Sequence, residues 1–189
     1  MTTERAAAEI AAQAARHTRL LLLDVDGVLT DGRLLLSDSG DEIKAFHSRD
    51  GHGLKMLMAS GVLVGLVTGR RSQAVTHRAA DLGIAIVVQG CRDKRAAVQT
   101  LLAEHGIAAD AAAFMGDDVI DLPAMESVGF GVTVADGHPL VRDRAHWVTR
   151  ERGGYGAVRE LCEFIMSAQG TLETQLGYVY QGECPWAGG

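Results

Sequence analysis

Apolar runs of strand length recur along the chain, separated by stretches with helical periodicity. The runs are continuous rather than alternating, which is typical of strands covered on both faces of a sheet. They lie at residues 20–25, 62–67, 84–88, 112–115, 129–134 and 146–149. The helical stretches lie at 51–60, 71–82, 93–105, 121–127, 138–144 and 156–169. This alternation predicts an α/β fold, a Rossmann-like three-layer α/β/α arrangement around a parallel sheet.

One segment interrupts this alternation. Residues 33–46 contain two short β-like runs around the sequence SDSGD. This pattern predicts a β-hairpin with Gly40 in its turn, inserted directly after the first strand. The helix that follows has Asp50 as its expected N-cap. Between the first two strands of the sheet we therefore expect only a hairpin and one helix.

The two ends of the chain differ from its alternating middle. Residues 1–19 are rich in alanine and predict a helical extension. Residues 173–189 lose helical periodicity and predict a flexible C-terminal tail. A length of 189 residues matches one domain, and we expect its body to span residues 20–172.

Composition and charge limit the kinds of molecule that the protein is expected to bind and the compartment in which it is expected to lie. The formal net charge is −6 and no basic run occurs, so nothing predicts binding to nucleic acid or to a membrane surface. The leucine run at residues 20–23 is cut short by Asp24, which excludes a signal peptide or a membrane span there. Cys91, Cys162 and Cys184 lack metal-like spacing and are expected to be reduced thiols of a cytoplasmic protein.

Polar residues that follow the apolar runs are the candidates for chemistry. In an open parallel sheet, ligands gather at the carboxyl ends of the strands, near a switch in strand order. Four acids, a hydroxyl and a lysine are expected to meet there. They are Asp24, Asp26, Thr68, Lys94, Asp117 and Asp121, with Asp118 as a further acid of the last group.

Four carboxylates at one edge of a sheet repel each other unless a cation lies between them. The expected metal ligands are Asp24, Asp26, Asp117 and Asp121, and an oxygen-only set favours Mg²⁺ as cofactor. A calcium loop of the EF-hand type is excluded, because Val28, Leu29 and Leu35 stand where an acid, a glycine and a glutamate are required.

Four motifs carry a resemblance to the haloacid dehalogenase superfamily of phosphohydrolases. They are DVDGVLT at 24–30, VTGR at 67–70, Lys94, and GDDVID at 116–121. Each motif lies at the end of an apolar run or at the start of the next helix. The resemblance implies a phosphomonoesterase that uses Mg²⁺. It also implies a capless member, because the motifs lie too close together for an inserted cap domain.

The resemblance implies a two-step displacement at the first motif. Asp24 would attack phosphorus in line and form an aspartyl-phosphate, which splits one difficult hydrolysis into two easier steps. Asp26 would protonate the leaving alkoxide and then draw a proton from the water that cleaves the intermediate. These residues are the expected nucleophile and the expected acid and base.

The other motif residues are expected to hold the metal and the phosphoryl group. Mg²⁺ would bind the first carboxylate of DVDGVLT, the backbone carbonyl of the second aspartate, and Asp117. Thr68 and Lys94 would bind the non-bridging phosphoryl oxygens. Asp121 or Asp118 would orient the lysine and a metal-bound water, and we favour Asp121.

Longer stretches narrow the resemblance to superfamily members that hydrolyse 3-deoxy-D-manno-octulosonate 8-phosphate (KDO 8-phosphate), a sugar-acid phosphate made for lipopolysaccharide. They include KAFHSRDGHGLKML at 44–57 and GGYGAVRELCEFI at 153–165. The resemblance implies a homotetramer in which a neighbouring subunit covers the open site. The substrate-binding residues that it implies are His47, Ser48, Arg49, Asp50, Gly51, Lys55, Gly69, Arg70 and Arg78.

Departures from the family pattern leave two alternatives. His47 stands in place of an asparagine, Lys55 in place of an arginine, and the tail ends differently. Because the altered loop lies where sugar length would be read, a nine-carbon ulosonate 9-phosphate of the sialic-acid type is an alternative substrate. A non-catalytic assembly module is the second alternative, but such a chain would be expected to lose Asp24, Asp26 or Lys94, and none is lost.

Overall fold

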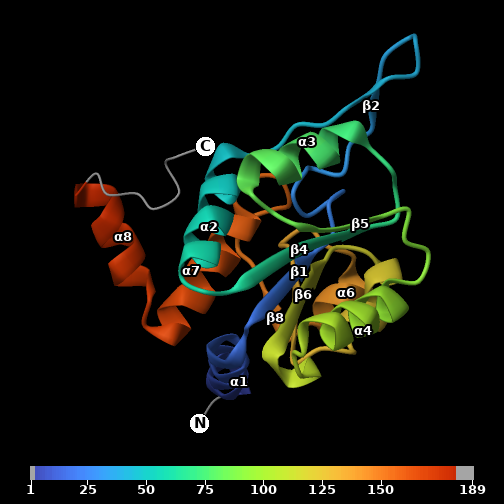
Figure 1. Ribbon diagram of the computed structural model, residues 1–189. Helices are drawn as coiled ribbons and strands as arrows, with labels where there is room; N and C mark the ends of the chain where they lie inside the picture. The colour runs from blue at the N-terminus through green and yellow to red at the C-terminus, as the bar shows by residue number, and fades with distance from the viewer. Residues whose placement is uncertain (1–2, 182–189) are drawn as a thin grey trace.

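The computed structural model describes residues 3–181, and six strands in it form one parallel sheet (Figure 1). The strands are β1 Leu20–Leu23, β4 Leu63–Thr68, β5 Ile86–Gln89, β6 Ala112–Gly116, β7 Phe130–Thr133 and β8 Trp147–Val148. Their order is β5-β4-β1-β6-β7-β8, and every neighbouring pair is parallel. The chain proceeds from β1 to β4 and β5 on one side and returns to β6 on the other. The strand order therefore switches at β1.

Helices cover both faces of the sheet, which confirms the predicted three-layer architecture (Figure 1). Leu21 and Leu23 of β1 pack with one set of helices, and Leu20 and Leu22 pack with the other. The first set is α1 Thr3–His17, α2 Ser48–Ala59, α3 Gln73–Leu82 and α7 Ala157–Gln169. The second set is α4 Lys94–His105, α5 Leu122–Met125 and α6 Pro139–Arg144. Burial on both faces explains the unbroken leucine run.

The helix α2 begins earlier than the sequence predicts, at Ser48, with His47 in the N-cap position. The prediction that Asp50 caps α2 is therefore wrong. Asp50 lies in the first turn of α2, and its Oδ1 accepts a hydrogen bond from the backbone N–H of Arg159 at 2.8 Å. The N-cap of α7 is Gly156, which has no side chain to offer. Asp50 supplies the missing acceptor from another helix.

The C-terminal segment is also more ordered than predicted. Residues Leu172–Gln181 form the helix α8, so the expectation that 173–189 lacks a helix is wrong up to residue 181. Leu172 and Leu176, four residues apart, pack against the core cluster that contains α7. The remainder of the expected tail, residues 182–189, lies outside the described chain, as does Cys184.

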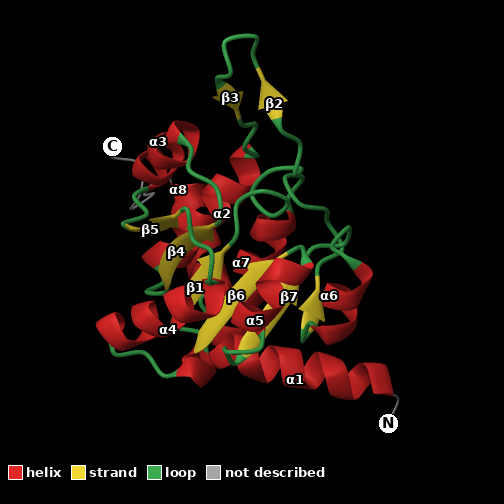
Figure 2. Cartoon of the chain, turned by 90° about the vertical axis from the view of Figure 1, so that its right-hand side faces the viewer, coloured by secondary structure: helices red, strands yellow, loops and turns green. Residues whose placement is uncertain are grey.

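The insertion between β1 and β4 is short. Strands β2 Leu35–Leu36 and β3 Glu42–Ile43 pair antiparallel, and Gly40 in their turn has a φ of 87°. This hairpin projects from the body of the molecule (Figure 2). Short 3-10 turns at Ala109–Ala111 and Val119–Asp121 flank β6. No inserted domain occurs within residues 3–181, and no helix in that range is long and apolar enough to cross a membrane.

Candidate active site

The candidate site lies at the carboxyl edge of the sheet, where the strand order switches. The backbone N–H of Asp24 donates to the carbonyl of Met115 at 2.9 Å and continues the ladder between β1 and β6. Thr68 ends β4 on the other side of β1 and is buried. The sheet register therefore places the ends of three strands, each followed by a predicted motif, at one edge.

Three carboxylates and one ammonium form a group that we call the acid cluster: Asp24, Lys94, Asp117 and Asp121. Asp117 is half-buried and the other three are buried. One oxygen from each of the three acids lies within 4.8 Å of the others. Lys94 Nζ lies 2.8 Å from Asp24 Oδ2 and 2.5 Å from Asp121 Oδ1. These residues lie just after β1, at the start of α4 and in the segment after β6. Segments that are distant in the sequence therefore form the acid cluster.

The single ammonium of the acid cluster does not balance the charge of its three carboxylates. Burial, together with the charge of Asp121, raises the pKa of Asp24 to about 6. Burial also raises the pKa of Asp117 to about 7, with further contributions from Asp121 and Asp24. Burial alone would lower the pKa of Lys94, but the same two acids reverse this and raise it. One ammonium thus does not offset three carboxylates.

The donors in this cluster fit a hard divalent cation. The Oδ1 atom of Asp24 is buried and has no hydrogen-bond partner among residues 3–181, so it remains available as a ligand. Carboxylate oxygens alone make up the set, which is the donor type that Mg²⁺ prefers. A cation there would also supply the missing positive charge. The carboxylate of Asp26 lies outside this group of three acids, which leaves its backbone carbonyl as the predicted ligand.

Asp118 and Asp121, the two acids of the fourth motif, have different environments. The Oδ2 of Asp121 accepts from the backbone N–H groups of Asp117 and Asp118, at 3.1 and 3.3 Å. Asp118 is exposed, and its Oδ1 accepts from the N–H of Val119 at 2.7 Å as a cap. The geometry favours Asp121 as the acid that acts with Lys94.

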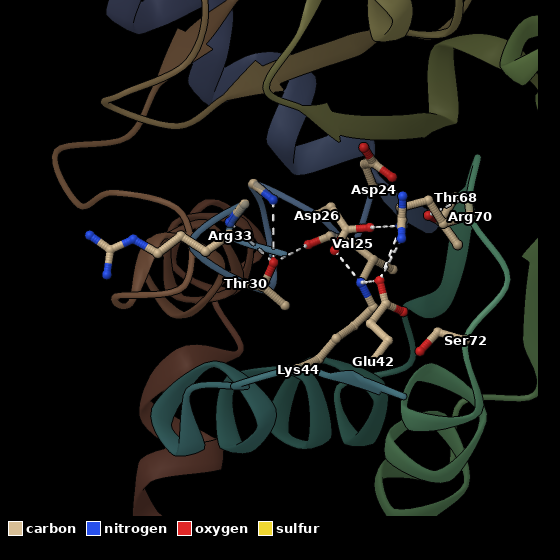
Figure 3. Close-up of polar contacts among 12 residues, drawn as sticks. Asp24, Val25, Asp26, Thr30, Arg33, Glu42, Lys44, Thr68, Arg70 and Ser72 are labelled. Carbon is tan, nitrogen blue, oxygen red and sulfur yellow. Dashed lines mark hydrogen bonds and ion pairs between the residues drawn. The ribbon is translucent and has the colours of Figure 1, made fainter. Parts of the chain in front are cut away.

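The loop after β1 folds back on itself. The carbonyl of Val25 accepts from the N–H of Thr30, whose hydroxyl lies 3.4 Å from the same carbonyl and 3.4 Å from the N–H of Gly27 (Figure 3). Gly27 has a φ of 91°, and a Cβ there would lie 2.1 Å from Asp117 Oδ2. Glycine is therefore required for the turn and for the close approach of Asp117.

A second glycine-containing segment, before α7, clamps this loop. The N–H of Gly154 donates to the carbonyl of Val28 at 3.0 Å. A Cβ on Gly153 would lie 1.8 Å from the carbonyl oxygen of Gly27, and the N–H of Gly153 donates to Asp136 at 3.0 Å. The sequence analysis did not identify this contact, because the two segments lie far apart along the chain.

Two basic side chains meet the carboxylate of Asp26 (Figure 3). Lys44 donates to Asp26 Oδ1, and Arg70 Nε lies 3.9 Å from Asp26 Oδ2. Glu42 lies between these cations and contacts both. Sequence reasoning identified Arg70 but missed Lys44 and Glu42. Only the structure shows their burial, because charged residues that alternate with apolar ones, as in EIKAF at 42–46, are ordinarily solvated.

The residues of the predicted substrate loop at the start of α2 differ in exposure. Ser48 and Arg49 are exposed, while Asp50 is buried between α2 and α7. Arg49 lines a cavity of about 460 Å³ with Arg150, Arg159, Tyr155, Gly156, Glu151, Glu160 and Glu163. His47 lines a smaller cavity of about 200 Å³ with Asp31, Ala45, Phe46, Gly154 and Tyr155. The structure thus places the loop beside two cavities rather than in the acid cluster.

The remaining predicted residues lie along α2, α3 and the end of β4. A Cβ on Gly51 would lie 2.2 Å from Arg78 Nη2, so this glycine leaves space for the guanidinium. Arg78 Nη1 donates to Asp81 at 2.6 Å, and its guanidinium lies over the ring of Phe46. Lys55 is half-buried further along α2, and Gly69 is exposed after Thr68.

Comparison with known proteins gives matches over most of the chain. The family model of haloacid dehalogenase-like hydrolases matches residues 84–160. The 3-deoxy-D-manno-octulosonate 8-phosphate phosphatase of Escherichia coli K12 is 47% identical over 163 residues, which are 86% of this chain and 87% of that protein.

Solved structures give the same result. The phosphatase of the same name from Yersinia pestis matches with a TM-score of 0.86 and 46% identity, over 87% of this chain and 89% of that one. The one from Moraxella catarrhalis was solved in complex with a magnesium ion, a phosphate ion and KDO. It matches with a TM-score of 0.88 and 40% identity, over 90% of this chain and 98% of that one.

Proposed function

Because the chain belongs to the 3-deoxy-D-manno-octulosonate 8-phosphate phosphatases of the haloacid dehalogenase-like hydrolases, we propose that it hydrolyses KDO 8-phosphate to KDO and phosphate. The observation that carries the proposal is the acid cluster, with Asp24 at the carboxyl end of β1 and Lys94 Nζ 2.8 Å away. The cluster places a carboxylate nucleophile, a cation and a set of metal ligands at the point where the strand order switches.

Asp24 acts as the nucleophile in this proposal. Its carboxylate attacks phosphorus and forms an aspartyl-phosphate as the bond to the sugar oxygen breaks. Asp26 gives a proton to that oxygen and later takes one from the water that cleaves the intermediate. The two side chains are separated by one residue in a loop fixed by Thr30 and by the contact with Gly153.

The phosphoryl oxygens are bound by Thr68 and Lys94. Both side chains are buried at the sheet edge, where hydrogen bonds and charge act more strongly than in water. Asp121 holds Lys94 in place through the 2.5 Å contact with Oδ1. When bound, Mg²⁺ would be held by Asp24, Asp117 and the Asp26 carbonyl and would offset the charge of the phosphate dianion.

The sugar acid is recognised by the basic residues outside the acid cluster. Arg70 is half-exposed next to Asp26, and guanidinium groups suit bidentate contacts with carboxylates. The other proposed contacts are His47, Ser48, Arg49, Asp50, Gly51, Lys55, Gly69 and Arg78. Support comes from the cavity beside His47, which is also lined by Asp31 and Gly154 next to the loop after β1. The cavity beside Arg49 shares Tyr155 with it.

The hairpin supports a proposed homotetramer in which a neighbouring subunit covers the site. Its leucine and isoleucine side chains are about half exposed, and it projects from the body (Figure 2). The exposed residues are Leu34, Leu35, Leu36 and Ile43. Exposed apolar clusters of this kind mark interfaces between proteins. Light scattering should give a tetramer, and a fully active monomer would contradict the proposal.

A cytoplasmic location is part of the same proposal. It is supported by the free thiols Cys91 and Cys162 in the described chain, because thiols persist in reducing compartments. Fractionation of cells of the source organism, with immunodetection of the protein, tests the location. We expect the signal in the cytoplasmic fraction, and a signal confined to another fraction would contradict it.

Phosphate release across a substrate panel tests the function. The panel contains KDO 8-phosphate, a nine-carbon ulosonate 9-phosphate and plain sugar phosphates, each assayed with Mg²⁺. We expect the highest kcat/KM on KDO 8-phosphate. A higher kcat/KM on the nine-carbon compound would show that this compound, and not KDO 8-phosphate, is the substrate. Equal kcat/KM values on all compounds would reject specificity for KDO 8-phosphate but not the phosphatase activity.

A further inference from the structure

Glu42 has no role in the reaction described above, yet it is the common acceptor for the two cations beside Asp26 (Figure 3). Its Oε1 accepts from Arg70 Nη2 at 2.8 Å and from Arg70 Nε at 3.1 Å. The same oxygen lies 3.3 Å from Lys44 Nζ. Both cations extend beyond Glu42 to Asp26, one to each carboxylate oxygen.

This contact joins the hairpin to the sheet. Glu42 belongs to β3, and Arg70 follows the end of β4, two residues after Thr68. Within residues 34–43, Glu42 is the only residue of the described chain whose side chain forms a hydrogen bond outside the hairpin. Glu42 therefore joins the hairpin to the end of β4, and Lys44, just after β3, adds a contact with Asp26.

Charge and burial explain why Lys44 needs Glu42 as a partner. The side chain of Lys44 is only 2% exposed, and a buried ammonium is tolerated only when it is paired and hydrogen-bonded. Burial acts to raise the pKa of Glu42, but hydrogen bonds from Ser72 and Arg70 and the charge of Lys44 lower it. Glu42 is therefore a carboxylate and a fixed anionic partner, whereas Asp26 must gain and lose a proton in the proposed reaction.

We propose that Glu42 is a positioning residue, which holds Arg70 and Lys44 in one arrangement beside Asp26 before the substrate arrives. The inference rests on the proposed function, because it assigns Glu42 to the same site. If the two cations are already in place, the reaction does not have to lose entropy to order them. Small displacements of groups at an active site lower the rate strongly. Glu42 itself need not touch the substrate, so its effect passes through the two side chains that it holds.

Three variants test the inference. Glu42→Gln keeps the size of the side chain and removes its charge, Glu42→Asp keeps the charge and shortens the reach, and Asp41→Asn is the matched control in the same hairpin. Asp41 is exposed and contacts only hairpin residues among those described. We expect Glu42→Gln to lower kcat about tenfold with less than about a threefold change in KM. Glu42→Asp should recover part of the rate.

The control separates positioning from loss of stability. Thermal unfolding of all three variants should differ from that of the parent by only a few degrees, because Lys44 keeps its contact with Asp26 and Asp41 is exposed. Wild-type kcat in Glu42→Gln would overturn the inference. An equal loss of kcat in Asp41→Asn would also overturn it, because the effect would then belong to the hairpin as a whole. Should Glu42→Gln fail to fold, the comparison of Glu42→Asp with Asp41→Asn takes its place.

A double-mutant cycle tests whether Glu42 acts through Arg70, which is half-exposed and can be truncated with little risk to folding. In an Arg70→Met background the effect of Glu42→Gln on kcat should shrink at least threefold, because interacting residues are non-additive. An undiminished effect would overturn the inference.

Each rate is measured on KDO 8-phosphate and on p-nitrophenyl phosphate. If the parent hydrolyses only the second compound, the proposed substrate is wrong, and Glu42 is then judged on that compound. If the parent hydrolyses both compounds and Glu42→Gln matches it, only the inference about Glu42 fails.

Discussion

Lys94 Nζ lies 2.8 Å from Asp24 Oδ2, and the side chains are only 4% and 7% exposed. Lys94 also contacts Asp121, so one ammonium serves two buried carboxylates. A buried charge network of this kind is sensitive to the loss of one member, because the partners are then left without compensation. In the proposed mechanism, the two members Lys94 and Asp24 act together at the phosphoryl group, as cation and nucleophile.

Replacement of Lys94 by methionine should affect both activity and stability. We expect kcat/KM on KDO 8-phosphate to fall at least about a hundredfold, because a buried cation for the phosphoryl oxygens is lost. The free energy of unfolding should fall by about 3 kcal/mol in metal-free buffer, since Asp24 and Asp121 lose their partner. Arg95→Met, an exposed neighbour on α4, is the control. Activity within a factor of about two in Lys94→Met would contradict the role given to Lys94.

The stability of the metal-free protein should depend on pH through Asp24 and Asp117. Their pKa values are raised in the folded state, to about 6 and about 7. The folded state therefore binds more protons than the unfolded state between the ordinary carboxylate range and these values. This contribution to stability is fully present below about pH 4 and is lost as pH rises through the folded pKa values.

Mg²⁺ should restore the stability that the metal-free protein loses as pH rises, because the carboxylate ligands of Mg²⁺ must be deprotonated to bind it. We expect the gain in Tm on adding Mg²⁺ to be small near pH 5 and several degrees near pH 8. Thermal unfolding in EDTA and in Mg²⁺ at both values measures the gain, with Asp117→Asn as a variant in which it shrinks. An equal gain at both values would contradict the raised pKa values.

Gly153→Ala should damage the site without touching a proposed catalytic residue. Its Cβ would lie 1.8 Å from the carbonyl oxygen of Gly27, so the loop that contains Asp26 must shift. We expect a loss of about 1–3 kcal/mol in unfolding free energy and a larger fall in kcat than stability alone explains. Gly177→Ala in α8 has open space around it and serves as control. Unchanged kcat in Gly153→Ala would show that this contact does not position the loop.

Variants of Asp50 distinguish a structural role, in which it joins α2 to α7, from the predicted contact with substrate. Asp50→Ala removes the acceptor for the N–H of Arg159 and should cost about 1–2 kcal/mol in urea unfolding. Asp50→Asn keeps an oxygen acceptor, and burial already raises the pKa of the carboxyl, so we expect little loss of stability. If Asp50 acts only between α2 and α7, KM for Asp50→Asn stays near the parent value. A rise in KM would support the predicted substrate contact.

Patterns within single segments predicted the sheet, its helices and the four motifs, because short continuous apolar runs that alternate with helical stretches, such as residues 20–23, are typical of strands covered on both faces. Contacts between distant segments could not be predicted in this way. Asp50 capping α7 and Gly153 against Gly27 depend on how helices and loops meet in space. Lys44 was missed for another reason, since a lone lysine in a hairpin is ordinarily a solvated charge.

Phosphate release by Asp24→Asn tests the central claim most directly. The variant keeps the shape of the side chain and removes its charge, so the fold and the contacts of β1 should be retained. With Mg²⁺ and KDO 8-phosphate, we expect the wild-type protein to release phosphate and Asp24→Asn to release it at least about a thousandfold more slowly. Phosphate release by Asp24→Asn at the wild-type rate would contradict the proposed nucleophile and the mechanism built on it.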